Sequence, residues 1–120
     1  MTIQKPYKRT DRVGLQILQI LGEITTKHIN ISHLGFITFT KVDVSTDLRH
    51  AKVFYSVLDQ KFSHEHIHSE LNMLSKAFRK YLGQEIRTKN TPGLIFYEDD
   101  SLKHEEHMMK VFKDLHKDES

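Results

Sequence analysis

Apolar residues recur along the chain with two periods, which separate predicted helices from predicted strands. Over residues 10–27 the spacing alternates between three and four, which places a single stripe on one face of a helix. The stripe consists of Val13, Ile17, Ile20, Leu21 and Ile24. Thr10 or Asp11 stands just before it and is a candidate N-cap, because a side-chain oxygen there can accept a bond from a first-turn amide. Residues 28–35 lose the period and predict a loop.

Two strands are predicted next. The segment 36–44 is rich in β-branched and aromatic residues, and 50–58 alternates apolar and polar positions. The Ser-Thr-Asp run at 45–47 supplies turn-forming side chains between them, which favours an antiparallel hairpin. In the first strand the apolar positions change from odd numbers, at Ile37 and Phe39, to even numbers, at Val42 and Val44. Two explanations remain open, a β-bulge or a strand buried partly on both faces.

Helical spacing returns near His64 and continues through the stretch 71–92. Its apolar stripe contains Leu71, Leu74, Phe78, Leu82 and Ile86. Pro92 ends the pattern, since a proline biases its predecessor away from helical geometry. The short apolar run 94–97 predicts a third strand, and Ser101 can cap a last helix. The apolar residues of that last helix are Met108, Met109, Val111, Phe112 and Leu115.

These elements predict one α+β domain in which helices cover one face of a small sheet. A chain of 120 residues with 38% hydrophobic content suits a single modest core. We expect a flexible basic arm over 1–9, a folded domain over 10–101 and an acidic C-terminal helix or tail over 102–120. The chain has no cysteine, which excludes disulfides and a Cys nucleophile, and no run approaches the ~18 apolar residues of a membrane span. A soluble, cytoplasmic monomer is expected.

Charge divides the chain into a basic body and an acidic end. Residues 1–97 hold 14 Lys and Arg against 8 Asp and Glu, a balance of +6, whereas 98–120 hold 4 against 8, a balance of −4. A basic body attracts polyanions through Coulomb steering and counterion release. The acidic end is expected to limit indiscriminate binding to nucleic acid.

The densest positive charge falls on the stretch 71–92, opposite its apolar stripe. Lys76, Lys80 and Arg87 lie on the far side, and Arg79 lies at the border, where its stem can be buried while the guanidinium stays in water. The predicted phosphate-binding residues are Lys76, Arg79, Lys80, Arg87 and Lys89, supported by the arm residues Lys5, Lys8, Arg9 and Arg12. Arg49 and Lys52 are weaker candidates, because their direction depends on the strand register.

Three runs of the chain resemble the ribosome-binding factor A family. TKVDVSTDLRHAKVFYSV at 40–57 is similar to the hairpin signature of that family, and LNMLSKAFRKYLG at 71–83 to its central helix. TPGLIFYEDDS at 91–101 is similar to its Thr-Pro, aromatic strand and Asp-Ser ending. The runs stand in the same order and at the same spacing as in the family.

The resemblance implies a type II KH fold, helix-strand-strand-helix-helix-strand, with a C-terminal helical extension. It also implies a non-enzymatic ribosome assembly factor without a cofactor. Its expected partners are 16S rRNA and the free 30S subunit, with assembly GTPases as further candidates. The expected role is late maturation and 5′-end processing of 16S rRNA, especially in the cold.

The sequence departs from the family at the nucleic-acid-binding element. It has no GXXG loop, and the family's Ala-x-Gly kink aligns with Leu74, Ser75 and Lys76. A lysine at the glycine position removes conformational freedom. The helix is then either nearly continuous, or bent because Ser75 bonds back to the preceding turn.

Other functional readings find less support in the sequence. The run His64, His66, His68 places only two histidines on one helical face, which falls short of a zinc site. Glu98, Asp99 and Asp100 suit a helix start better than a nuclease centre, because no second carboxylate cluster completes one. We therefore expect neither metal nor catalysis. The alternative function is a protein-interaction module that binds a ribosomal protein or an assembly GTPase without touching RNA.

Overall fold

The computed structural model describes residues 8–99, which form three helices, a short 3-10 turn and three strands. The elements in chain order are α1 (Arg9–Lys27), η1 (Ser32–Leu34), β1 (Phe36–Val44), β2 (His50–Leu58), α2 (His64–Met73), α3 (Ser75–Glu85) and β3 (Gly93–Glu98). This order confirms the α+β, KH-like architecture and the bounds of the first two strands. The predicted loop at 28–35 contains the η1 turn. The predicted last helix lies outside the described residues.

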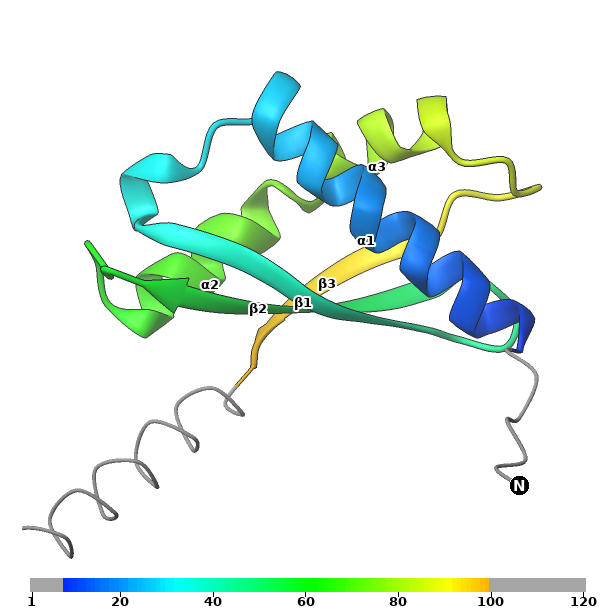
Figure 1. Ribbon diagram of the computed structural model, residues 1–120, viewed down its shortest axis with the longest axis horizontal. Coiled ribbons are helices and arrows are strands. Elements are labelled where there is room, and N and C mark those ends of the chain that lie inside the picture. Colours follow the sequence, from blue (N-terminus) through cyan, green and yellow to red (C-terminus); the bar gives the residue numbers. More distant parts are fainter. Residues whose placement is uncertain (1–7, 100–120) are drawn as a thin grey trace, which may run out of the picture.

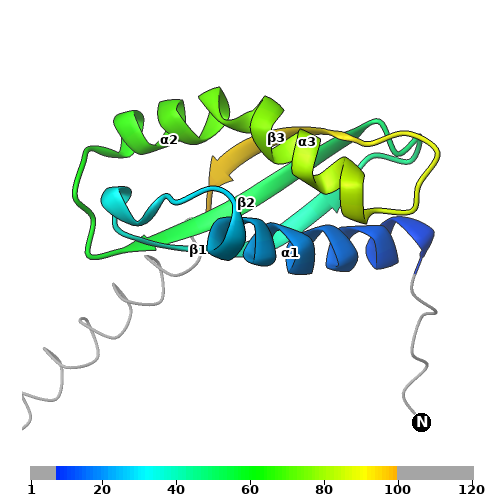
Figure 2. The ribbon, with the colours of Figure 1, turned by 90° about the horizontal axis from the view of Figure 1, so that it is seen from above.

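The sheet has the strand order β1-β2-β3, with β1 antiparallel to β2 and β3 parallel to β2. The three helices cover one face of this sheet, as Figures 1 and 2 show from two directions. A parallel pair needs a crossover connection, and here α2 and α3 provide it between β2 and β3. No described helix has both the length and the apolar character needed to span a membrane.

The hairpin contains the β-bulge that the sequence left open. Phe39 pairs with Tyr55 and Lys41 with Phe54, so Thr40 is the extra residue on β1. The insertion reverses the parity of β1, which is why Phe39 and Val42 both turn toward the helices although three positions separate them. The predicted turn is also present, with the Asp47 carboxylate accepting from the Arg49 backbone N–H at 3.1 Å.

Helix α1 begins at Arg9, two residues earlier than a Thr10 cap would allow and three earlier than an Asp11 cap. Lys8 is the N-cap, and Asp11 sits inside the first turn, where its carboxylate accepts from the Lys8 backbone N–H at 3.2 Å. The expectation that Thr10 or Asp11 would be the N-cap was therefore wrong. The carboxylate still helps the helix start, because it reaches back from the first turn and lies at the positive end of the helix dipole.

The stretch 71–92 is not one helix. Leu74 separates α2 from α3, and the predicted cause of a bend, a bond from Ser75 to the preceding turn, is not observed. Ser75 Oγ donates to the Leu94 carbonyl of β3, not to the preceding turn. Asn72 holds the other side of the break, donating to the Phe96 carbonyl at 3.1 Å and accepting from the Phe96 N–H at 2.9 Å. Backbone groups of the edge strand β3 thus hold the end of α2 and the start of α3 in place.

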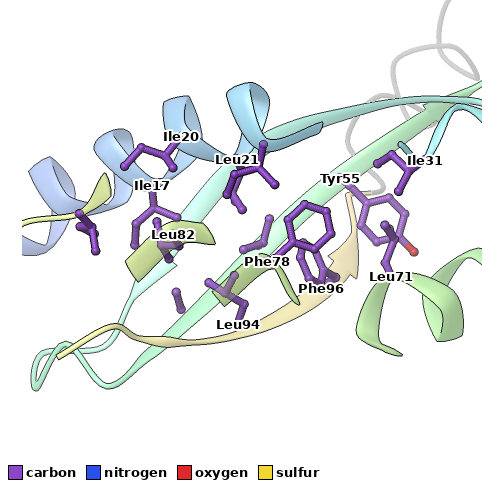
Figure 3. Close-up of a cluster of buried hydrophobic side chains, with 14 of the residues drawn as sticks. Ile17, Ile20, Leu21, Ile31, Tyr55, Leu71, Phe78, Leu82, Leu94 and Phe96 are labelled. Atoms are coloured by element: carbon purple, nitrogen blue, oxygen red, sulfur yellow. The ribbon is translucent and has the colours of Figure 1, made fainter. Parts of the chain in front are cut away.

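The core lies between the helical layer and the sheet. Figure 3 shows Ile17, Ile20 and Leu21 of α1 beside Phe78 and Leu82 of α3, with Phe96 of β3 next to Phe78. The rings of Phe78 and Phe96 are 5.2 Å apart between centroids, and Phe39 of β1 meets Phe78 edge-on. Every member of the predicted α1 stripe is buried, so periodicity located this face correctly.

Candidate nucleic-acid interface

A basic groove of about 520 Å³ lies between α3 and the segment that leads from it into β3. Its lining residues are Lys76, Arg79, Lys80, Gly83, Lys89, Asn90 and Thr91. Four of these seven are cations and none is a carboxylate. The groove opens to solvent, and the exposed lysine and arginine side chains give it the charge that an anionic ligand requires.

Helical spacing and a main-chain contact together assemble the groove. Lys76 and Lys80 are four residues apart on α3 and therefore project from the same face. Arg79 Nε and Nη2 both donate to the Thr91 carbonyl, at 3.1 and 2.9 Å, which ties the segment carrying Lys89 to the helix. Arg79 is exposed as a whole residue, and the burial of its stem stays a prediction.

Gly83 allows the segment to approach α3 closely. A Cβ atom at this position would lie 2.9 Å from Thr91 Oγ1, so an alanine would force that hydroxyl to move. Close packing at Gly83 therefore shapes the groove, while its charge comes from the lysine and arginine side chains.

The groove gathers four of the nine predicted phosphate-binding residues, namely Lys76, Arg79, Lys80 and Lys89. Arg87 is exposed on the segment after α3 but does not line the groove. Lys8, Arg9 and Arg12 lie at the start of α1, at the same end of the molecule as this segment (Figure 2). Lys5 lies outside the described residues.

The strand register settles the direction of Lys52. Lys52 pairs with Asp43 on β1 and Ile95 on β3, on the sheet face that the helices leave open, so it points away from the groove. Arg49 lies in the hairpin turn, and its carbonyl accepts from the Gly93 N–H at 2.8 Å. Neither residue contributes to the groove.

Two of the histidines considered as metal ligands, His64 and His66, lie next to carboxylates. His64 Nδ1 lies 3.0 Å from Glu98 Oε2, while His66 and His33 lie 3.2 and 2.8 Å from the two oxygens of Glu70. The His33 contact holds the pKa of the Glu70 carboxyl below its ordinary value. Within residues 8–99 no three such side chains cluster in a way that could hold a metal ion.

Sequence reasoning missed the three uncharged residues of the groove. Asn90 and Thr91 carry no charge, and the interaction of Thr91 with Arg79 uses a backbone carbonyl that every residue type possesses. Gly83 did carry a signal, since a glycine inside a helical pattern costs helix stability and marks close packing. That signal identifies a contact but not its partner.

Comparison with known proteins identifies the family. The model of the family "Ribosome-binding factor A" matches residues 9–112. Ribosome-binding factor A of Natranaerobius thermophilus is 34% identical over 110 residues, which cover 89% of this chain and 82% of that protein.

Solved structures have the same fold. The solution NMR structure of a Thermotoga maritima candidate ribosome-binding factor A superposes with a TM-score of 0.66 at 25% identity, covering 82% of this chain and 93% of that one. A homology model of the Thermus thermophilus ribosome-binding factor A, fitted into a cryo-EM map of its 30S complex, gives a TM-score of 0.58 at 18% identity, covering 72% of this chain and 91% of that one. With a family match over most of its length and relatives of this similarity, the chain belongs to the ribosome-binding factor A family.

Proposed function

We propose that the protein is a non-catalytic assembly factor that binds the free 30S subunit and contacts 16S rRNA through the basic groove. Membership of the family and the 30S complex of the Thermus protein support the subunit as target. In this proposal the protein acts in the cytoplasm and supports late maturation and 5′-end processing of 16S rRNA. Its importance is expected to increase in the cold.

The observation that carries the RNA contact is the grouping of four cations around one groove without a carboxylate in its lining. Phosphate contacts of Lys and Arg position a protein on nucleic acid but do not read its sequence. Selectivity for the immature subunit would then come from the shape of the rRNA. Proteins recognise double-stranded RNA mostly by its shape and by contacts to its sugar-phosphate backbone.

Charge reversal in the groove tests the proposal. The Lys76→Glu/Lys80→Glu variant should weaken binding to a 16S rRNA fragment by at least about tenfold and reduce the slope of log affinity against log salt by about two. The matched control is Lys27→Glu/Lys61→Glu, which makes the same change in net charge at exposed lysines that do not line the groove. Fluorescence anisotropy at several salt concentrations measures both quantities.

The protein-interaction alternative predicts a different result. If the protein recognises a ribosomal protein or an assembly GTPase without touching RNA, binding to the purified subunit should be insensitive to salt and unchanged by the groove substitutions. That outcome would contradict the proposal. Equal losses in the groove variant and in the control would also contradict it, because only overall charge would then matter.

A further inference from the structure

The sheet face that the helices leave open carries large apolar side chains. Phe36, Leu58 and Ile95 are 66%, 47% and 45% exposed, and Phe54 and Tyr97 are partly exposed. The register places Phe36 opposite Leu58 and Phe54 opposite Tyr97, whose ring centroids are 6.0 Å apart. We call these five residues the open-face patch. A sheet face that meets only water usually carries polar residues, so the patch indicates a partner.

The patch lies where the chain leaves the sheet. β3 runs parallel to β2, so both strands finish at the end of the sheet where β1 begins, close to the Phe36–Leu58 pair. Beyond β3 the Asp99 N–H donates to the Tyr55 carbonyl at 2.6 Å. The Asp99 carboxylate accepts from Thr40 Oγ1 at 2.7 Å, although β2 separates β1 from β3. By the alternation of β3, Asp99 shares the face of Ile95 and Tyr97, so its side chain lies on the open face and reaches β1.

The charged residues of this face are few. Lys41 and Lys52 stand beside Asp43, and the Lys41 Nζ lies 3.5 Å from Asp43 Oδ1. With Asp99 on the same face these charges cancel, while residues 100–120 hold 4 Lys against 6 Asp and Glu, a balance of −2. The charges permit an acidic partner, but the apolar patch supplies most of the attraction.

We propose that residues 100–120 of the same chain dock on the open face and cover the patch. Met108, Phe112 and Leu115 are spaced as one face of a helix and would meet the apolar side chains of the patch. A helix over 102–120 would be about 28 Å long at ~1.5 Å per residue, close to the ~30 Å length of a nine-residue strand. The inference does not depend on RNA binding.

A spin label on the full chain tests this docking. The chain has no cysteine, so Asp114→Cys provides a single attachment site for a nitroxide and leaves the apolar residues of the segment intact. The backbone amide signals of the open-face residues Thr38, Ser56 and Ile95 should then lose most of their intensity in a ¹H–¹⁵N spectrum. Those of Gln16 and Gln19, on the exposed side of α1, should keep theirs. High salt should reduce the loss only slightly, because the contact is mainly apolar.

Two variants show whether the patch is responsible. Ile95→Glu in the labelled chain should restore the open-face signals, whereas Leu15→Glu, at an α1 leucine that is 56% exposed, should not. The unperturbed signals of each variant report whether it is folded. Retained open-face intensity in the labelled parent chain would overturn the proposal. A loss that also appears when a labelled ¹⁴N chain is mixed with an unlabelled ¹⁵N chain would overturn it too, because the occupant would then be a second copy.

Discussion

Arg79 Nε and Nη2 both donate to the carbonyl oxygen of Thr91, at 3.1 and 2.9 Å. A planar guanidinium can direct two N–H groups at one acceptor, which a lysine ammonium does with less geometric definition. The contact joins α3 to the segment before β3 and brings Lys89 next to Lys76 and Lys80. Arg79 therefore contributes a charge to the groove and also holds the groove together.

Replacing this arginine by lysine separates the two contributions. Arg79→Lys keeps the charge, so the salt dependence of binding to a 16S rRNA fragment should not change. Affinity should nevertheless fall about threefold to tenfold, because one or two loop side chains must be ordered on binding at ~0.5–1.5 kcal/mol each. Hydrogen exchange of the amides at 87–91 should accelerate in the free protein.

Lys80→Arg is the control for this prediction, since it also exchanges one cation for another in the groove. It should leave the affinity and the exchange rates of the segment unchanged. If Arg79→Lys also left the affinity and the exchange rates unchanged, Arg79 would not be needed to position the segment.

Gly14 is needed because α1 packs against the backbone of β1. A Cβ atom at Gly14 would lie 2.6 Å from the Val42 carbonyl oxygen, a contact that a backbone cannot relieve without moving the strand. Gly14→Ala should therefore lower the free energy of unfolding by about 1–3 kcal/mol, as overpacked cores do. Urea denaturation measures the change.

Gly22 on the same helix is the matched control. Nothing lies within 4 Å of a Cβ atom there, and the position is exposed. Gly22→Ala should raise the free energy of unfolding by up to about 1 kcal/mol, because alanine has the higher helix propensity. Destabilisation of equal size at both positions would show that the close approach at Gly14 is not the cause.

Tyr55 points its hydroxyl into the core without a hydrogen-bond partner among the described residues. Burial raises the pKa of Tyr55 to about 12, and the Glu98 carboxylate adds to the rise. Because the unfolded value is about 10, folding favours the protonated phenol. The contribution of this pKa difference to the free energy of unfolding is fully present below about pH 10. It is lost as the pH rises toward about 12.

Tyr55→Phe should thus change both stability and its pH dependence. Below pH 10 the variant should unfold with a free energy about 1 kcal/mol higher, because an unsatisfied buried hydroxyl is removed. As the pH rises above 10, the free energy of unfolding should fall less in the variant than in the parent chain. Urea denaturation at a series of pH values checks this, with Tyr97→Phe as a control that retains the decline. If the free energy of unfolding of Tyr55→Phe fell with pH as it does in the parent chain, groups other than Tyr55 would cause the decline.

Most individual elements could be predicted because their signals are local. The stripe on α1, the strands 36–44 and 50–58 and the turn at Asp47 depend on neighbours a few residues away. The cationic residues of α3 could be placed on one face for the same reason. Their role in RNA binding stays a proposal, as do the domain boundaries.

The sequence by itself therefore determined the helical and strand periods, the polar and apolar faces, and the family resemblance. Only the tertiary structure decided where the second helical stretch breaks and which residues complete the groove. Both depend on β3, which follows that stretch in the chain and returns parallel to β2. Its backbone binds Asn72 and Ser75 at the break, and the segment leading into it meets Arg79 through a carbonyl. Backbone groups are common to all residue types, so such contacts leave no residue pattern in the sequence.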